Sequence, residues 1–274
     1  MVSEALFTIS GKTAVVTGGS GELGRAMVEG LAQAGARVAI LGQHEESVSR
    51  ATQALREKGY EVIGLASDVG ERDALEGALE RITSAFGPID ILVNGAGGNQ
   101  PAATTSSERA FFDLDRQAIE RVFNLNFTGT LLACQVFGRG MSERGQGCIV
   151  NIASMNALRP LTRIPAYSAA KAAIANFTQW LAVHMAQEYS PQIRVNAISP
   201  GFFLTEQNRY LLTDAQSGQF TPRGESIVGH TPMGRLGKAE ELVGTLLWLV
   251  SPASAFVTGI VVPVDGGFSA FSGV

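Results

Sequence analysis

The chain has 274 residues, a formal net charge of −4 at pH 7 and 45% hydrophobic residues. This length and composition allow one large domain or two small ones with a buried core. The slightly negative charge gives no electrostatic footprint for nucleic acid or for an anionic membrane surface, so we expect neither as a partner.

The sequence also limits where the protein works and what it binds. Residues 1–10 lack the basic region and long apolar run of a signal peptide, and no segment has the roughly 18 uncharged apolar residues that span a bilayer. Cys134 and Cys148 lie in apolar stretches, which favours buried thiols in a reducing compartment over a disulfide. These features together lead us to expect a cytoplasmic protein. The three histidines are far apart and have no cysteine partners, so we expect no metal site.

Short apolar, β-branched runs alternate with helix-patterned segments along the chain. We expect strands at residues 13–17, 37–41, 61–66, 90–94, 148–154, 193–199 and 260–265, and helices at 22–34, 45–58, 71–86, 115–140, 167–189 and 239–250. Parallel strands need helical crossovers, and strands buried on both faces are continuously hydrophobic. The pattern predicts a single α/β domain over residues 1–274, with a Rossmann fold: a doubly wound, seven-stranded parallel sheet covered by helices on both faces.

One long irregular stretch, at about residues 202–232, directly follows a predicted strand. Loops of this length are usually functional, and ligands of open α/β sheets bind at the carboxyl ends of the strands. We therefore expect this segment to form a lid over the substrate.

The stretch "TGGSGELG", residues 17–24, lies between the first strand and the first helix. In that context the backbone N–H groups and the positive end of the helix dipole would hold a pyrophosphate. The expected cofactor residues of this loop are Gly18, Gly19, Gly21, Glu22, Leu23 and Gly24. We expect the Glu22 side chain to turn to water, where the helix dipole stabilises a carboxylate by about 0.3–1 kcal/mol. Taken alone, the loop could also be a turn that only packs helix on strand.

A second motif, "YSAAK", places Tyr167 and Lys171 one helical turn apart on the same face. Ser154 lies thirteen residues before Tyr167 at a strand end, and Asn126 lies in the helical segment "FNLNFTG". When a hydride leaves an alcohol carbon, the hydroxyl proton must leave too, so a base must lie within hydrogen-bond reach. We expect the ammonium of Lys171, together with the charge of a bound nicotinamide, to lower the pKa of Tyr167, which would be that acid/base.

Two polar residues complete this catalytic group. Ser154 would donate a hydrogen bond to the reacting oxygen and stabilise the negative charge that develops there. Asn126 would hold a water molecule that links Lys171 to solvent. Each residue alone has an ordinary structural explanation, and their order after the glycine loop is what favours a catalytic role.

These motifs resemble the short-chain dehydrogenase/reductase family over nearly the whole chain, although Glu22 stands where the family pattern has glycine. The resemblance implies the catalytic residues Asn126, Ser154, Tyr167 and Lys171. It also implies cofactor contacts at Gln43, Asp68, Val69, Asn94, Ala96, Gly97, Tyr167, Lys171, Pro200, Gly201 and Thr205. The family further implies a homotetramer or homodimer built on the helices that begin near residues 115 and 167.

The choice between NAD and NADP follows no simple rule in this sequence. Gly42 stands at the usual position of the ribose-binding aspartate, and Gln43 stands where NADP-dependent relatives often have arginine. Gln43 and His44 could bind a ribose hydroxyl, but neither is a permanent cation for a phosphate. We expect NAD or NADP, with NAD favoured.

The substrate is predicted from polar residues near the expected reaction centre, namely Asn99, Gln100, Asn156, Arg159, Arg163, Gln207, Asn208, Arg209, Arg223 and His230. We take Asn99, Asn156, Arg163 and Arg209 as the candidate contacts, because amides and guanidiniums suit hydroxyls and a carboxylate. The runs "NIASMNALRPLTRIPAYSAAKAA" and "PGFFLTEQNR" also resemble bacterial D-mannonate oxidoreductases, or fructuronate reductases.

Most of these polar residues could instead lie on the surface or at subunit contacts. Two alternatives to a sugar-acid enzyme also stay open at this point. The enzyme could be a 3-oxoacyl or other carbonyl reductase, which would have an apolar pocket. The chain could also be a nucleotide-sensing protein without turnover.

Overall fold

Seven strands form one sheet in the order β3-β2-β1-β4-β5-β6-β7, and every neighbouring pair is parallel. The computed structural model describes residues 6–205, 209, 211–214 and 217–273. The strands are β1 (Thr13–Thr17), β2 (Arg37–Gly42), β3 (Val62–Ala66), β4 (Ile91–Asn94), β5 (Gly147–Ile152), β6 (Ile193–Pro200) and β7 (Val261–Val264). This arrangement confirms the predicted Rossmann-type fold.

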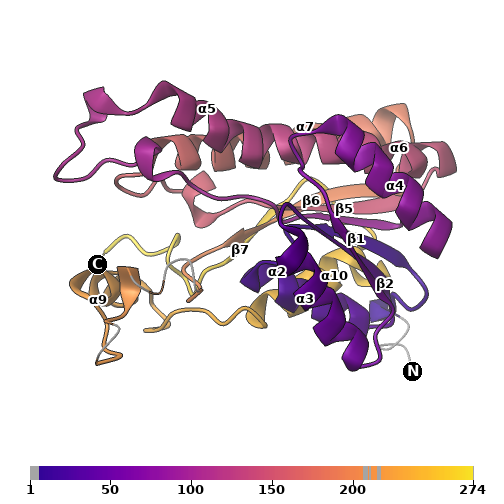
Figure 1. Cartoon of the computed structure of the whole chain (residues 1–274), viewed down its shortest axis with the longest axis horizontal. Coiled ribbons are helices and arrows are strands. Elements are labelled where there is room, and N and C mark those ends of the chain that lie inside the picture. Colours follow the sequence, from indigo (N-terminus) through magenta and orange to yellow (C-terminus); the bar gives the residue numbers. More distant parts are fainter. Residues whose placement is uncertain (1–5, 206–208, 210, 215–216, 274) are drawn as a thin grey trace.

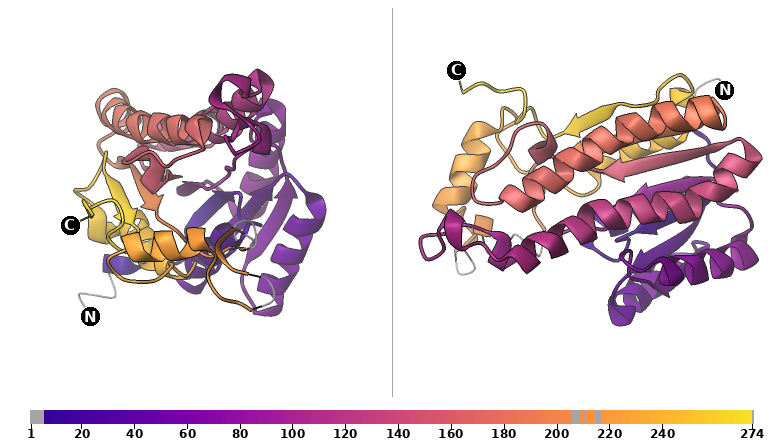
Figure 2. Two further views of the ribbon diagram at one scale, coloured as in Figure 1. Left: turned by 90° about the vertical axis from the view of Figure 1, so that its left-hand side faces the viewer. Right: turned by 90° about the horizontal axis from the view of Figure 1, so that it is seen from above.

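Helices cover both faces of the sheet (Figure 1). One face carries α2 (Glu22–Gln33), α3 (Glu45–Glu57) and α10 (Glu241–Val250). The other carries α4 (Arg72–Phe86), α5 (Arg116–Phe123), α6 (Gly129–Arg144) and α7 (Pro165–Glu188). Seen from above, α7 runs beside the helix formed by α5 and α6 (Figure 2). Among the described residues, no helix is long and apolar enough to cross a membrane.

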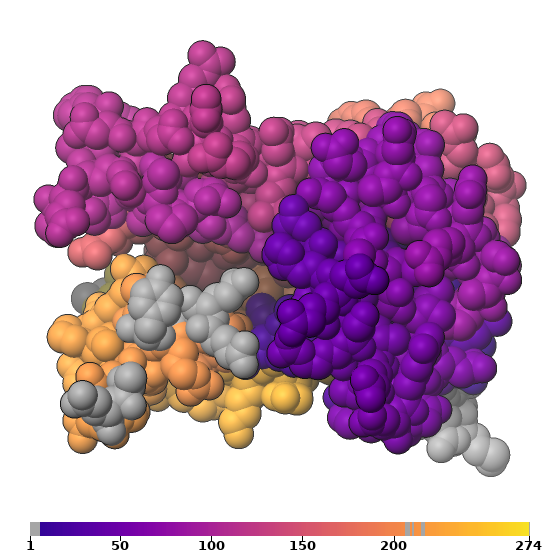
Figure 3. Space-filling model, in the orientation of Figure 1, coloured from indigo at the N-terminus to yellow at the C-terminus, as the bar shows by residue number. Residues whose placement is uncertain are grey.

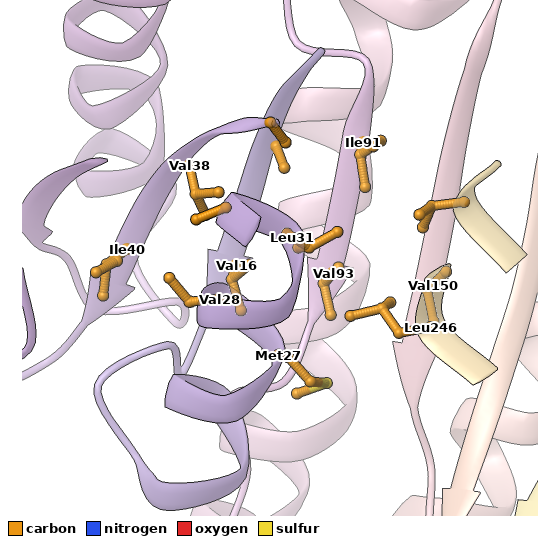
Figure 4. Packing of buried hydrophobic residues seen from close by; sticks show 14 of the residues in the cluster. Val16, Met27, Val28, Leu31, Val38, Ile40, Ile91, Val93, Val150 and Leu246 are labelled. Atoms are coloured by element: carbon orange, nitrogen blue, oxygen red, sulfur yellow. The ribbon is translucent and has the colours of Figure 1, made fainter. Parts of the chain in front are cut away.

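The strand residues alternate between two hydrophobic clusters because successive side chains point to opposite faces of a sheet. Val16 and Ile40 pack against Met27 and Leu31 of α2 on one face (Figure 4). Their neighbours Val15 and Leu41 belong to the cluster on the other face. Both layers are thus fixed to the sheet, which holds the strand ends in place for the site.

Two local features differ from the sequence prediction. The long helix after β4 contains a π-helical turn, Asn124–Thr128, between α5 and α6, and π turns inside helices are frequent at functional sites. The segment 202–232, expected to be irregular, contains α9 (Pro222–His230). At its start, Thr221 Oγ1 caps the helix by accepting from the Gly224 N–H at 3.1 Å, and Pro222 lies in the first turn. Both features are recognised signals for the start of a helix.

The strand order reverses at β1, which lies between β2 and β4. The connections after β1 and β4 therefore diverge to opposite faces and leave a crevice at the carboxyl ends of the strands, where open α/β sheets bind their ligands. The surface is hollowed between the magenta segment after β4 and the orange segment that contains α9 (Figure 3). The predicted functional residues are gathered around this edge of the sheet.

Candidate functional site

The glycine loop after β1 closes tightly against its surroundings. Gly18 has a φ of 67°, and a Cβ there would lie 2.8 Å from the Cα of Ala96, while a Cβ on Gly24 would overlap the carbonyl oxygen of Gly18. Gly21 is the N-cap of α2 and has no side chain that could bond the N–H groups of the first helical turn. A backbone-lined crevice at a helix start fits the pyrophosphate of a dinucleotide.

The other loop residues surround this crevice as the helix begins. Glu22 is the first residue of α2, and it and Leu23 are half-buried. A Cβ on Gly19 would lie 3.0 Å from the carbonyl oxygen of Val16. Side chains are therefore excluded on the strand side of the loop.

Asn126 lies in the π turn and ties the helix to the loop after β4. Its Nδ2 donates to the Gly98 carbonyl at 2.7 Å and to the Val122 carbonyl at 2.8 Å, and its Oδ1 accepts from the Gly98 N–H at 3.2 Å. A Cβ on the intervening Gly97 would lie 2.6 Å from Asn126 Oδ1 and 3.1 Å from Lys171 Nζ. The amide thus holds the loop in addition to any bond it makes to water.

The structure brings Ser154, Tyr167 and Lys171 together. Ser154 follows β5, and Tyr167 lies in the first turn of α7, where Ser154 is close enough to act on the pKa of its phenol. Lys171 Nζ lies 5.6 Å from the centre of the Tyr167 ring and donates to the Ile152 carbonyl at 2.8 Å. Lys171 is only 3% exposed. The short motif therefore assembles a hydroxyl, a phenol and an amine at one strand end.

Taken together, the chain's own residues do not lower the pKa of Tyr167, and Lys171 is not among the groups that shift it. Burial raises the pKa of Tyr167 above its usual value near 10, and the hydrogen bond from Ser154 opposes that rise. Burial also lowers the pKa of Lys171 to about 8. An amine that is partly neutral at mildly alkaline pH, and whose Nζ bonds a backbone carbonyl, stabilises a phenolate less than the sequence argument assumed.

Asn156 was expected to contact substrate, but its side chain is buried and bonded within the chain. Its Nδ2 donates to Ser154 Oγ at 3.1 Å, and its Oδ1 accepts from the Leu161 N–H at 3.1 Å and from Ser168 Oγ at 3.3 Å. Because Ser154 Oγ accepts from this amide, its own proton is directed elsewhere. We interpret Asn156 as a positioning residue.

The end of β2 has no room for the usual ribose-binding carboxylate. A Cβ on Gly42 would lie 2.6 Å from Ser20 Oγ and 2.9 Å from a methyl group of Val48. The next residue, Gln43, is exposed, and its Nε2 donates to Asp68 Oδ2 at 2.9 Å. Gln43 and Asp68, which follow β2 and β3, thus form a hydrogen-bonded pair in which Asp68 carries a carboxylate.

Some predicted cofactor contacts are better explained as parts of the fold. Asn94 is 2% exposed inside β4, and its Nδ2 donates to Asn151 Oδ1 of β5 at 2.9 Å, so its side chain joins two strands. Val69 is buried and its side chain packs closely against Gly129. A Cβ added to Gly129 would lie 2.6 Å from Val69 Cγ2. The adenine contact expected at Val69 would have to involve backbone.

The remaining predicted cofactor residues follow β4 and β6. Ala96 N–H donates to Thr17 Oγ1 at 3.2 Å, which fixes the loop after β4 beside the glycine loop. Pro200 ends β6, and a Cβ on Gly201 would lie 2.6 Å from the Cα of Asp265. Thr205 is half-buried three residues after Phe202. These positions border the same crevice edge as the catalytic residues.

The other substrate candidates are spread over the surface. Asn99 is exposed and donates to Thr104 Oγ1 at 2.9 Å. Arg159, Arg163 and Arg209 are exposed. Arg163 also has a φ of 74° and lines an open cavity together with Arg223 and His230. Gln207 and Asn208 lie outside the described residues.

Comparison with known proteins identifies the family of this chain. The family described as short chain dehydrogenase matches residues 12–216. An uncharacterized oxidoreductase, UxuB, of Bacillus subtilis (strain 168) is 50% identical, with 97% of this chain and 98% of that protein covered.

Two solved structures are similar over almost their whole length. A provisionally named D-mannonate oxidoreductase from Haemophilus influenza with bound NAD is 44% identical, with a TM-score of 0.92 and 100% of both chains covered. A gluconate 5-dehydrogenase from Burkholderia cenocepacia J2315 in complex with NADP and tartrate is 30% identical, with a TM-score of 0.87 and 98% and 99% of the two chains covered.

Proposed function

Because the chain belongs to the short-chain dehydrogenase family, we propose that it is a sugar-acid oxidoreductase of the D-mannonate/D-fructuronate type. It transfers a hydride between a nicotinamide dinucleotide and a secondary alcohol or ketone. The observation that carries the catalytic part is the grouping of Ser154, Tyr167 and buried Lys171 at one strand end, with Lys171 Nζ 5.6 Å from the centre of the Tyr167 ring.

The proposed roles follow from the protonation of these residues. The nicotinamide ring supplies or accepts the hydride when the cofactor is bound. During ketone reduction the neutral phenol of Tyr167 donates its proton to the substrate oxygen, and a raised pKa keeps that proton in place. Ser154 donates a hydrogen bond to the same oxygen. Lys171 then returns a proton to the phenolate, and Asn126 holds the loop that borders Lys171.

The cofactor would be held by the glycine loop of residues 18–24 at its pyrophosphate and by Gln43 and Asp68 at its adenosine ribose. We favour NAD because the Asp68 carboxylate, bonded to Gln43 at 2.9 Å, would repel a ribose phosphate. The N-terminus of α3 would attract an anion, but Glu45 and Glu46 already occupy its first turn. The bound NAD of the Haemophilus relative supports this preference.

A sugar acid is the substrate class that the relatives and the polar residues support best. One similar structure is a gluconate 5-dehydrogenase with tartrate bound, and tartrate is a hydroxylated acid. We propose that the segment of residues 202–232, whose described part includes α9, closes over this substrate.

We also propose a homodimer or homotetramer that uses α7 and the adjoining α5–α6 helix. The exposed face of α7 carries Trp180 and Val183, each 57% exposed, and large exposed apolar side chains of this kind favour a subunit contact. Two buried free thiols, Cys134 and Cys148, support a cytoplasmic location.

The proposal is tested with a substrate panel of aldonates, hexuronates, polyols and acyl thioesters. Each is assayed for formation or loss of reduced nicotinamide with NAD and with NADP. We expect saturable turnover of D-mannonate or D-fructuronate. Turnover of acyl thioesters without turnover of any sugar acid would overturn the substrate class but leave the oxidoreductase activity standing.

A further inference from the structure

A cavity of about 740 Å³ lies between the segment after Ser154, helix α9 and the C-terminal segment. The titratable groups that line it are Arg163, Arg223 and His230, and the described residues of its wall include no acidic side chain. Neither guanidinium makes a hydrogen bond or ion pair within the part of the chain that the structure describes. Two arginines without partners on one wall are an arrangement suited to an anion.

Aromatic rings form part of the remaining wall, which also includes Thr162 and Ser226. The ring of His230 lies 4.7 Å from the ring of Phe268 and 5.1 Å from that of Phe271, and Phe202 meets Phe268 edge-on at 5.1 Å. These contacts fix the imidazole against the floor of the cavity.

The backbone at Arg163 is the second observation that points to a ligand. Arg163 is the one non-glycine residue with positive φ among those described, at 74°. Its carbonyl accepts from the Thr105 N–H at 2.9 Å, which helps to hold this conformation. A glycine would adopt it without strain, so the arginine side chain is retained at a position where the backbone disfavours it. Such outliers gather at ligand-binding sites.

The cavity is connected to the catalytic serine. Leu161, which also lines the cavity, donates its N–H to Asn156 Oδ1, and Asn156 in turn donates to Ser154 Oγ. Arg163 lies two residues before the first residue of α7, the helix that carries Tyr167. A small acid with its reacting carbon at Ser154 and Tyr167 would thus direct its other end towards this wall.

From these contacts we propose that Arg163, Arg223 and His230 bind the carboxylate of the substrate. The inference rests on the proposed function and specifies its acid recognition. The guanidiniums supply paired N–H donors, and His230 supplies a ring N–H on the same wall. The hydroxylated part of the acid then extends to the catalytic residues.

The test uses the full-length protein with Arg163→Gly, Arg223→Gln and the control Arg81→Gln. Arg81 is exposed on α4, so the control removes one positive charge away from the cavity. The acids D-mannonate and D-gluconate are compared with their neutral counterparts D-mannitol and D-glucitol. Binding to the NAD-loaded protein is measured by titration calorimetry, and KM and kcat are measured separately.

We expect Arg163→Gly and Arg223→Gln each to weaken binding of the acids about tenfold or more, with a higher KM and a nearly unchanged kcat. Binding of the neutral polyols should change less than about twofold, since they lack the carboxylate. Arg163→Gly should also keep or raise the melting temperature, because glycine relieves the backbone strain. A structural role alone would instead lower it.

Unchanged acid binding in both cavity variants would overturn the carboxylate site, as would an equal loss for acids and polyols. If wild-type protein still oxidises the acids in that case, the proposed oxidoreductase function stands and only the site is wrong. Absence of sugar-acid turnover and binding in the wild type would instead overturn the substrate class on which this inference rests.

Discussion

Asn156 donates its side-chain N–H to Ser154 Oγ at 3.1 Å, and both residues are only 7% exposed. The amide therefore occupies an acceptor position of the hydroxyl and leaves the Ser154 proton for another oxygen. An isosteric carboxylate would reverse this bond, because it can accept a proton but cannot donate one.

Asn156→Asp is consequently expected to lower kcat about tenfold to a hundredfold, because Ser154 would donate to the new carboxylate instead of the reacting oxygen. KM should change less. The variant keeps an oxygen to accept from Leu161 and Ser168, so a circular dichroism melt checks that the fold is intact. Full activity in folded Asn156→Asp would show that the amide only supports the loop.

The glycine loop offers a matched pair of substitutions. A Cβ on Gly24 would overlap the Gly18 carbonyl oxygen, whereas a Cβ on Gly21 would lie 3.4 Å from the same oxygen. Gly24→Ala should therefore destabilise the fold by about 1–3 kcal/mol and weaken nucleotide binding, while Gly21→Ala should fold normally. Urea unfolding and NAD titration measure both effects. Equal stability and NAD affinity in the two variants would argue against the close packing of this loop.

The pair Gln43 and Asp68 predicts how cofactor choice can be changed. Asp68→Asn removes one negative charge beside the ribose and keeps an oxygen for the Gly70 N–H, which donates to Asp68 Oδ1 at 2.8 Å. We expect the ratio of the dissociation constants for NADP and NAD to fall about fivefold, and further in Gln43→Arg/Asp68→Asn. Calorimetric titration with each nucleotide gives the ratio. A ratio that stays constant in both variants would place cofactor choice elsewhere.

Lys171 predicts a component of the pH dependence of stability. Its pKa is lowered by burial to about 8, whereas an unfolded lysine titrates near 10.4. Between these values the unfolded chain binds more protons, so this residue makes the folded state more stable as pH rises, by up to about 1.4 kcal/mol per pH unit. Below pH 8 lysine is protonated in both states and its contribution is constant.

Burial raises the pKa values of Cys134 and Cys148 to about 12 and about 11. These two thiols make the folded state less stable as pH rises, and they are present in both wild type and the Lys171 variant. The difference in unfolding free energy between wild type and Lys171→Met therefore isolates the lysine. We expect the unfolding free energy of wild type, relative to that of the variant, to increase from pH 8 to 10. Denaturant titration at each pH measures this difference. A difference independent of pH would contradict the lowered pKa.

Local patterns made most of the fold and the catalytic group predictable. Tyr167 and Lys171 share a helix face because of the helical period, and Ser154 ends a strand whose apolar run is continuous. The Gln43–Asp68 bond joins residues 25 positions apart and depends on strand order, which the sequence does not specify locally. The bond between Asn94 and Asn151 could not be predicted for a similar reason, since Asn151 lies in the neighbouring strand.

The segment before α9 shows a different limit. Thr221, Pro222 and Glu225 form a recognisable helix start, but Gly224 and Gly229 obscure the apolar period that would continue it. The two glycines lower the intrinsic helix propensity of the segment, and packing in the folded chain outweighs them. Gly224 in particular is buried, and a Cβ there would meet Phe220 at 3.1 Å.

The central claim is that the Tyr167 hydroxyl transfers the proton that accompanies hydride transfer. The most direct test compares wild type with Tyr167→Phe, which removes one oxygen and keeps the ring, in single-turnover hydride transfer and in NAD titration. The account predicts that kcat falls about a hundredfold to ten-thousandfold while NAD binds with nearly unchanged affinity. Equal hydride-transfer rates in the two proteins would contradict it.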